Sequence, residues 1–499
     1  MYRYVTDDAK TWHRAEFPHD HGGLREDAYT ILESTSYSIQ VDVLTTKAWN
    51  PLGSLFTSNS NGTYFTRNLD HTNRIPEGLV DFEQVANIQG IVLANVVKNA
   101  DQVLESPQTA RKEIQSLISF DDGKWDTWVP LKGPEDKRLN LYSVTALADG
   151  GRIYSSPAPG ILMGVGSLGD HLAGYKDCDL FYSDDGGLTW EKALTDAHKY
   201  EIGGSGSVMV AINDEDLTDK VSYSIDHGKN WEEVKLDEKI HAKLLTTTPD
   251  STTLKFTLIG TTRDKTTYVF ALDFSEVFER KCKLDKGSED GDYEKWYARL
   301  DEEGKPDCLM GHKQYFWRRK PGVNCYVGED YKDPEPEKEV CECTKHDFEC
   351  DFNFVRENGK KDDNCVRAKG IKLSIPAGEC KKNEDTYKGP SGYRKIPGND
   401  CKDGESLEDK VERKCDEGWL KSPIQITPLY QQRANRSLVT TTPSNGKVTD
   451  VKNSFAGKRV AEYFYLENAE SASKSDEVSR LKLFFCIALL KAYDCRQLL

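Results

Sequence analysis

The chain has 499 residues, of which 37% are hydrophobic and 30% charged, and its formal net charge is −16. This is the composition of an ordinary globular protein that is long enough for several domains. The acidic balance argues against a nucleic acid as partner, because proteins that bind a phosphate backbone carry a clustered basic surface. The basic aromatic run YFWRRK at 315–320 is predicted to be a half-buried strand whose cations are solvated.

Residues 1–275 consist mainly of short apolar runs separated by turn signals. Typical runs are GIVLANVV at 90–97, SVMVAI at 207–212 and TYVFALDF at 267–274. They are rich in β-branched and aromatic side chains and are bounded by Gly, Asp or Asn, which is the pattern of strands. Long helical periodicity is missing. We therefore expect an all-β region, and a turn motif that recurs within it favours a β-propeller.

The recurring turn reads Ser-x-Asp-x-Gly-x-x-Trp, as SDDGGLTW at 183–190 and SIDHGKNW at 224–231. The Asp carboxylate can accept hydrogen bonds from its own loop, Gly tolerates a positive φ, and Ser adds a local hydrogen bond. Trp can then fill the apolar layer below while its N–H stays near polar backbone. The turn is thus predicted to be scaffolding. Its residues are Ser183, Asp185, Gly187 and Trp190, and Ser224, Asp226, Gly228 and Trp231.

Two weaker copies of the turn support this interpretation. SFDDGKWDTW at 119–128 has a longer spacing to Trp128, and Trp125 is an alternative for the same role. VTDDAKTW at 5–12 lacks the Ser and the Gly. Catalytic residues would not decay in some copies and persist in others. The retained positions are Ser119, Asp121 and Gly123 in the first copy, and Asp7, Thr11 and Trp12 in the second.

Two other site types are weighed against scaffolding. A glycoside hydrolase would need two carboxylates facing each other across a cleft, whereas neighbours such as Asp184 and Asp185 on a tight turn point apart. GVGSLG at 164–169 matches a dinucleotide-binding fingerprint, but a strand pattern follows it instead of the required helix. We therefore expect a Gly-rich hairpin there, and no cofactor.

Ten of the 13 cysteines lie in the charged segment 276–420. An even number in a loop-rich region indicates a disulfide framework and an oxidising compartment, with five bridges whose pairing stays open. Zinc binding by Cys341, Cys343, His346 and Cys350 is less favoured, because the chain has no C-x-x-C pair. The ten are Cys282, Cys308, Cys325, Cys341, Cys343, Cys350, Cys365, Cys380, Cys401 and Cys415.

Residues 421–499 begin with a Ser-, Thr-, Pro- and Asn-rich stretch that is typical of a linker, and 461–470 could start a further strand module. Asn61 and Asn435 are glycosylation acceptors if the chain meets the secretory pathway. The first residues have no apolar signal-peptide core, and no window reaches the ~18 apolar residues of a membrane span. Together with the disulfide framework, this predicts a piece of a longer protein.

With these residues in view, the chain resembles a known family. The turns are similar to the Asp boxes of sialidases and of sortilin-type sorting receptors. Segments 54–74, 155–170 and 199–212 resemble late blades of the sortilin propeller, and FERKC, GYRKIPGNDC and the ten cysteines resemble the module that follows it. The chain is most similar to fungal vacuolar protein sorting receptors, which carry hydrolases such as carboxypeptidase Y.

The resemblance implies a fold, a function and a site. The expected fold is about half of a ten-bladed Asp-box β-propeller over 1–275, braced by the disulfide-rich module. The expected function is non-enzymatic: the lumenal, ligand-binding part of a membrane receptor that takes soluble hydrolase precursors from the late Golgi to endosomes. Tyr29 and Thr30 fall where the family offers backbone to a bound peptide, and Arg3 lies near its carboxylate-anchoring position. A sialidase-like hydrolase and an adhesion module remain as alternatives.

Overall fold

The computed structural model describes most of the chain up to residue 420. The expected tail at 421–499, with Asn435, lies outside the described residues, as do Arg3, Asp7 and Thr11. Two units are distinguished, one of Met1–Ile371 with Lys388–Val411 and one of Lys372–Tyr387 with Glu412–Leu499, and each is treated by itself. The described residues are 4–6, 10, 12–18, 29–46, 49–149, 153–285, 290–328, 335–360, 363–371, 373–375, 380, 385–415 and 418–420.

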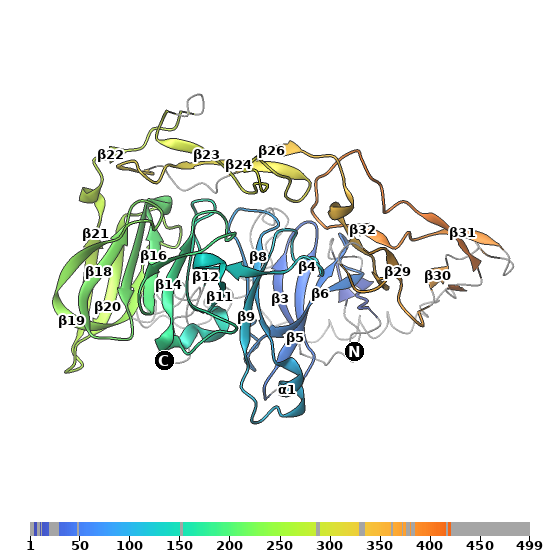
Figure 1. Cartoon of the computed structure of the whole chain (residues 1–499), viewed down its shortest axis with the longest axis horizontal. Coiled ribbons are helices and arrows are strands. Elements are labelled where there is room, and N and C mark those ends of the chain that lie inside the picture. Colours follow the sequence, from blue (N-terminus) through green and yellow to red (C-terminus); the bar gives the residue numbers. More distant parts are fainter. Residues whose placement is uncertain are drawn as a thin grey trace, which may run out of the picture. The chain divides into compact units, whose positions relative to one another are not determined.

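The first unit begins with five successive antiparallel meanders, which are the blades of a propeller (Figure 1). Within four of the five blades, strands that follow each other in the chain pair with each other, and the third blade departs from this order. Blade 1 contains β3 (Tyr29–Ser34), β4 (Ile39–Leu44), β5 (Leu52–Ser58) and β6 (Phe65–Asn73). Blade 2 contains β7 (Phe82–Gln84), β8 (Val92–Val97), β9 (Ile114–Ser119) and β10 (Val129–Lys132), with helix α1 (Ala100–Glu105) between β8 and β9.

The remaining three blades follow along the chain. Blade 3 contains β11 (Arg138–Leu141), β12 (Ile153–Ser155), β13 (Leu162–Leu168), β14 (Asp179–Ser183) and β15 (Glu191–Leu194). Blade 4 contains β16 (His198–Gly203), β17 (Val208–Asn213), β18 (Thr218–Ser224) and the first part of β19 (Glu232–Thr246). Blade 5 contains the rest of β19, β20 (Lys255–Thr261) and β21 (Thr267–Asp273). A separate pair, β1 (Tyr4–Val5) and β2 (His13–Arg14), precedes them.

Side-chain patterning explains why these blades stack face to face. In β20, Phe256 and Leu258 are buried and alternate with more exposed neighbours, as one covered face requires. In β13 nearly every residue is buried, because both of its faces are covered. Apolar clusters therefore lie between successive blades. One joins Met163 and Leu180 of blade 3 to Ile202 and Met209 of blade 4, and another joins Val210 of blade 4 to Phe256 of blade 5.

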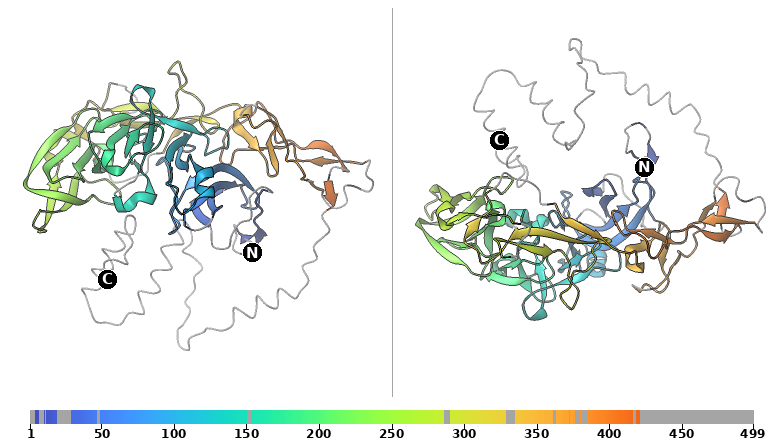
Figure 2. Two further views of the ribbon diagram at one scale, coloured as in Figure 1. Left: turned by 60° about the horizontal axis from the view of Figure 1, so that its bottom comes forward. Right: turned by 90° about the horizontal axis from the view of Figure 1, so that it is seen from above.

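The part of the disulfide-rich module that belongs to the first unit extends along these blades (Figure 2). Its long strand β24 lies between β23 and β26 in a three-stranded sheet. Within the first unit its strands are β22 (Arg280–Lys281), β23 (Tyr293–Tyr297), β24 (His312–Arg319), β25 (Cys325–Tyr326), β26 (Glu337–Val340), β27 (Phe348–Cys350), β28 (Phe354–Arg356), β29 (Cys365–Arg367) and β32 (Tyr393–Lys395). The second unit contains the parallel pair β30 (Leu373–Ile375) and β34 (Gly418–Leu420). Two further strands are β31 (Thr386–Gly389) and β33 (Val411–Lys414).

The ten cysteines of the module form five disulfides, as predicted. The bridges are Cys282–Cys325, Cys308–Cys341, Cys343–Cys401, Cys350–Cys365 and Cys380–Cys415. The zinc alternative is therefore wrong, because its three cysteines are oxidised with three different partners. Among the described cysteines Cys178 has no disulfide partner, and it is buried in the core of blade 3. The expected all-β propeller with a disulfide-rich module is confirmed, whereas the domain boundaries at 275 and 420 stay predictions.

Candidate functional site

In the turn at 183–190 the polar side chains form hydrogen bonds within the turn itself. Ser183 Oγ donates to Asp185 Oδ1 at 2.8 Å and accepts from the Gly187 amide at 2.9 Å. The two carboxylate oxygens of Asp185 accept from the Thr189 amide at 3.0 and 3.1 Å. Trp190 is 1% exposed, and its Nε1 donates to the Gly187 carbonyl at 3.1 Å. Gly187 has a φ of 90°, which favours glycine there.

The turn at 224–231 repeats this geometry. Ser224 Oγ donates to Asp226 Oδ1 at 2.8 Å and accepts from the Gly228 amide at 3.0 Å, while Trp231 Nε1 donates to the Gly228 carbonyl at 2.9 Å. Asn230 donates its amide to Asp226 at 2.9 Å. In both copies the carboxylate is directed into its own loop, so it is not positioned to act on a substrate across a cleft.

In the turn at 119–128 the two candidate tryptophans, Trp125 and Trp128, have different environments. Ser119 Oγ accepts from the Gly123 amide at 3.0 Å, as in the other copies, and Trp128 Nε1 donates to the Gly123 carbonyl at 3.1 Å. Trp128 therefore occupies the indole position in spite of its longer spacing. Trp125 is instead 44% exposed and lies beneath the Arg67 guanidinium, 5.2 Å from its ring centre.

The expected copy at 5–12 lacks a buried indole, so this prediction is wrong for Trp12. Its side chain is 60% exposed. The physical reason is the local sheet: among the described strands β1 and β2 form a sheet of two short strands, which is too small to cover an indole.

A further turn of this kind was missed in the sequence. SNSNGTYF at 58–65 keeps the spacing from Ser58 through Gly62 to an aromatic residue, Phe65, which is 2% exposed. Asn59, one position before that of the Asp in the other copies, supplies the acceptor: its Oδ1 accepts from the amides of Thr63 and Tyr64 at 2.9 and 3.0 Å. Described blades 1 to 4 therefore each carry such a turn between their last two strands.

Two arginines of β24 hold these turns against the module. Arg318 Nη1 donates to the carbonyls of Asp184 and Pro159 at 2.7 and 3.1 Å, and Arg319 Nη2 donates to the carbonyls of Ile225 and Ser207. The side chain of Arg318 is 7% exposed, and Arg319 as a residue is 4% exposed. The prediction of solvated cations in YFWRRK is therefore wrong, because these guanidinium groups satisfy backbone carbonyls that the blades leave at the interface.

Arg394 makes the corresponding contact with blade 1. Its Nη2 donates to Thr66 Oγ1 at 2.6 Å and to the Thr57 carbonyl at 3.1 Å. Its Nε donates to Glu349 Oε1 at 2.7 Å, which balances the buried charge. Buried cations of the module thus reach blades 1, 3 and 4 at or beside the ends of their turns.

The predicted ligand strand β3 lies at one end of the sheet order and has β4 as its single strand neighbour within the described residues. Tyr29 and Ile31 are 46% and 60% exposed. Thr30 is used internally, because its Oγ1 donates to the Gly78 carbonyl at 2.7 Å and accepts from Arg74 Nη2 at 3.4 Å. The hydroxyl of Thr30 is therefore already engaged within the fold.

A buried polar network contacts β3 through Thr30, to which Arg74 donates. Arg74 pairs with Asp42 at 2.6 Å, and both side chains are at most 5% exposed. Burial raises the pKa of Asp42 to about 6, although Arg74 acts in the opposite direction. Lys112 Nζ donates to the carbonyls of Pro51 and Arg74 at 2.7 and 2.8 Å, and burial lowers its pKa to about 8. Because Arg74 is committed to Asp42, it is not the carboxylate anchor of a ligand.

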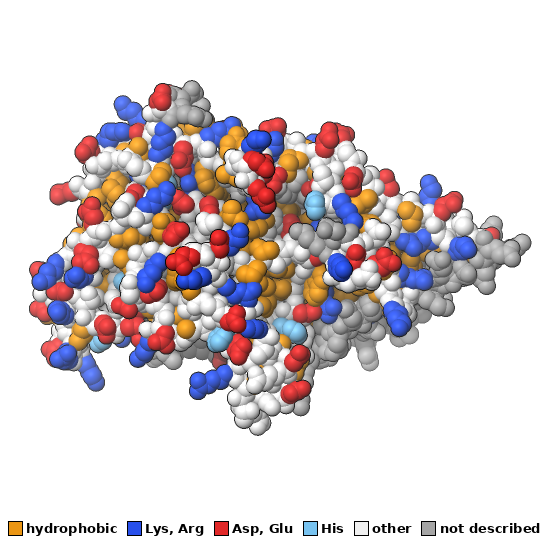
Figure 3. Space-filling view, viewed as in Figure 1, with side chains coloured by type: hydrophobic (Ala, Val, Ile, Leu, Met, Phe, Trp, Pro, Cys, Tyr) orange, Lys and Arg blue, Asp and Glu red, His pale blue; other side chains and the backbone are white. Residues whose placement is uncertain are grey.

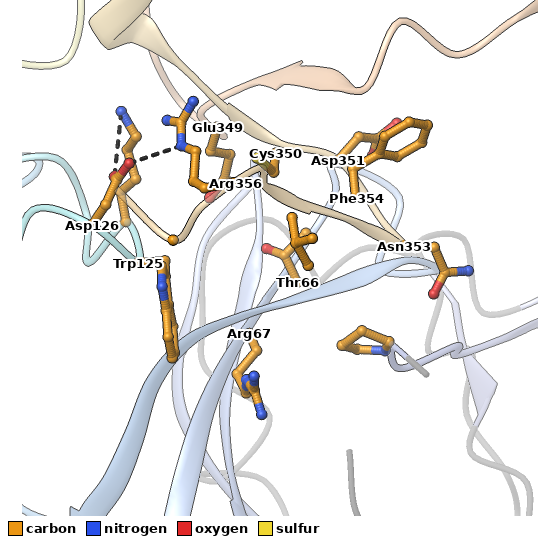
Figure 4. A pocket seen from close by; sticks show the side chains of 14 residues that line it. Thr66, Arg67, Trp125, Asp126, Glu349, Cys350, Asp351, Asn353, Phe354 and Arg356 are labelled. Atoms are coloured by element: carbon orange, nitrogen blue, oxygen red, sulfur yellow. Dashed lines mark hydrogen bonds and ion pairs between the residues drawn. The ribbon is translucent and has the colours of Figure 1, made fainter. Parts of the chain in front are cut away.

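A cavity of about 260 Å³ lies between blades 1 and 2 and the module (Figure 4). Its lining includes Arg67 and Arg356, but Arg356 Nε is engaged with Asp126 Oδ2 at 2.9 Å. The sialidase alternative would need converging arginines with an acid and a tyrosine, and the lining contains no tyrosine. The residues that line the cavity are Pro18, Thr66, Arg67, Lys124, Trp125, Asp126, Glu349, Cys350, Asp351, Asn353, Phe354, Val355, Arg356 and Gly359.

Two further features concern the charged surface and the helices. On the face shown in Figure 3, acidic and basic side chains of the described residues are interspersed rather than gathered into a basic patch. In the part of the chain that the structure describes, no helix has the length and apolar character to span a membrane.

Two solved structures show distant similarity. An ancestral GH74 enzyme is 12% identical, with a TM-score of 0.29, over 73% of this chain and 47% of that one. A structure titled YCF48 bound to D1 peptide is 13% identical, with a TM-score of 0.25, over 67% and 90% of the two chains. Scores this low carry no conclusion about catalysis or ligands.

Sequence relatives are much closer. A protein of Uncinocarpus reesii named Vacuolar protein sorting/targeting protein 10 is 50% identical over 96% of this chain, and one of Aspergillus flavus with the same name is 48% identical over 95%. The chain spans about 30% of the length of these relatives. The family model for sortilin, neurotensin receptor 3, matches residues 1–245, and the model for its C-terminal part matches 247–415. The chain therefore belongs to the sortilin family.

Proposed function

We propose that this chain is the cargo-binding, lumenal part of a vacuolar sorting receptor. The proposed cargo is a soluble hydrolase precursor of the carboxypeptidase Y type, carried from the late Golgi to endosomes. The names of the relatives, which are about 50% identical, support a role in vacuolar sorting. Five disulfides support an oxidising lumen. Asn61 is exposed on the turn of blade 1, which suits a glycan acceptor.

The observation that carries the proposal is the place of strand β3 at one end of the sheet order of the described residues. An extended cargo segment can add to such a strand through main-chain hydrogen bonds, while side chains provide selectivity. Tyr29 and Ile31 would contact the cargo, and the Thr30–Gly78 hydrogen bond with the Asp42–Arg74 pair would keep the strand rigid. Arg3 remains a proposed contact for a terminal carboxylate.

Binding of a purified carboxypeptidase Y precursor to the immobilised chain tests the proposal. We expect saturable binding that Tyr29→Ala and Ile31→Asp weaken about tenfold or more. Val269→Asp is the matched control, because Val269 is 67% exposed on β21, which ends another sheet. Absence of binding, or equal loss in the control, would remove the proposal. Failure to capture vacuolar hydrolases, with capture of cell-surface proteins instead, would favour an adhesion module.

We also propose that the chain has no catalytic activity. The carboxylates of the intact turns are held by their own loops, as Asp185 is by Thr189 and Ser183. The chain should hydrolyse a fluorogenic sialoside no faster than a Trp190→Ala preparation, which serves as the background control. Turnover that depends on a carboxylate of the chain would restore the sialidase alternative.

A further inference from the structure

The cavity beside Trp125 has the size of a subsite for one side chain. Its volume of about 260 Å³ is below the ~300–1,000 Å³ of sites that enclose a whole small-molecule ligand. Two of its lining residues, Trp125 and Val355, are 44% and 41% exposed. Exposed apolar side chains around a small pocket are typical of a surface that meets another polypeptide.

The charges on the Trp125 side of the cavity are already paired. Asp126 lies between two cations, with Arg356 Nε at 2.9 Å and Lys124 Nζ at 3.8 Å, and its side chain is 8% exposed. Arg67 lies over Trp125 and 3.6 Å from Asp70. Figure 4 shows Trp125 and Arg67 apart from Asp351 and Phe354, which lie next to each other. The charged side chains beside Trp125 are therefore already in contact with groups of opposite charge or with an aromatic ring.

On the module side one carboxylate, that of Asp351, forms no ion pair within the described residues, although the Arg394 cation lies near enough to act on its pKa. Glu349 is paired with Arg394, whose other donors go to blade 1. Asp351 accepts the Phe352 amide at 2.7 Å, but within the described residues it forms no ion pair. Burial raises the pKa of Asp351, and this effect outweighs the Phe352 amide and the nearby Arg394 cation, which both act to lower it. A cation would compensate this desolvated carboxylate.

The groups around Asp351 suit a long basic side chain. Phe354 and Pro18 provide apolar surface for methylene groups, and an aromatic ring can also attract a cation. From this pairing of charges we infer that the cavity is a subsite for a Lys or Arg side chain of a bound polypeptide, with Asp351 as its counter-ion. The inference rests on the proposed function, since it makes that polypeptide the cargo and adds a contact remote from β3.

Synthetic peptides test the subsite directly on the full chain. The probe is an N-acetylated, C-amidated peptide with one Lys flanked by Leu residues, and its matched forms carry norleucine or Glu in place of Lys. We expect saturable binding of the Lys form, about tenfold weaker binding of the norleucine form, and still weaker binding of the Glu form. Equal binding of the Lys and norleucine forms, or preference for Glu, overturns the inference.

Substitutions locate the site and separate the two proposals. Asp351→Asn should reduce Lys-peptide affinity about tenfold, whereas Glu357→Gln, an exposed acid on the same segment, should not change it. If the precursor binds but Asp351→Asn leaves Lys-peptide affinity unchanged, the subsite is wrong and the proposed function stands. If the Lys peptide binds through Asp351 and no precursor binds, the pocket stands and the proposed cargo function fails.

Discussion

Replacement of Arg318 by Ala tests whether buried arginines join the module to the blades. The substitution removes two hydrogen bonds to the carbonyls of Asp184 and Pro159, the bond to Glu294, and the guanidinium that lies 4.8 Å from the Trp296 ring centre. Two interface carbonyls would lose a charged donor in a site where the Arg318 side chain is 7% exposed. Charged hydrogen bonds contribute about 1.5–3 kcal/mol each, so we expect a loss of about 3–5 kcal/mol.

The expected loss corresponds to a fall of the unfolding midpoint on the order of 5–10 °C in differential scanning fluorimetry. Hydrogen exchange adds a local measurement: the Gly186 amide, which donates to Gly160, should lose protection more than amides of blade 5. Arg280→Ala is the control, because Arg280 contacts Asp292 twice at 2.6 Å but is 49% exposed. If Arg280→Ala lowers the midpoint as much as Arg318→Ala, burial is not the cause and the reasoning fails.

Three further predictions concern the turns, the pH dependence of stability and the cysteines. Trp190→Ala should cost about 3–5 kcal/mol by chemical denaturation, whereas Trp12→Ala should stay within ~0.5 kcal/mol; equal effects would contradict the burial argument. Burial, with the nearby Glu349, raises the pKa of Asp122 from 3.8 to about 7, so the folded state holds a proton that the unfolded state releases and stability should fall as pH rises between these values. Asp122→Asn should remove that contribution and be relatively more stable at pH 8 than at pH 4, and parallel profiles would refute it. Burial raises the pKa of the Cys178 thiol to about 12, so it should resist alkylation until the chain unfolds; rapid labelling of the native chain would contradict its buried position.

The fold was largely predictable because its signals are local. Alternation in β20 and the continuous apolar run of β13 reflect which faces are covered. The turn from Ser183 to Trp190 closes its hydrogen bonds within eight neighbouring residues, so a pattern read along the chain captures it. The copy from Ser58 to Phe65 was missed because Asn59 supplies the acceptor from a different position.

The roles of individual aromatic and charged residues were less predictable, because they depend on neighbours that are distant in sequence. Trp125 and Trp128 differ in burial according to which one meets Gly123 and blade 1, since Trp128 Nε1 also donates to the Asn68 carbonyl at 3.1 Å. Thr30 fits its predicted strand, but its hydroxyl is occupied by Gly78, 48 residues away. Such contacts leave no periodic trace in the sequence.

The sequence by itself determined the strands, the self-contained turns and the even number of cysteines, because each follows from bonds among near neighbours or from simple counting. The tertiary structure alone decided which cysteines pair, such as Cys343 with Cys401, and that Arg318 and Arg319 are buried. It also created the cavity near Asp351. The physical reason is that a charged side chain is buried only where partners for it converge. For Arg318 and Arg319 these partners include backbone carbonyls distant in sequence, which come together only after the blades and the module have packed.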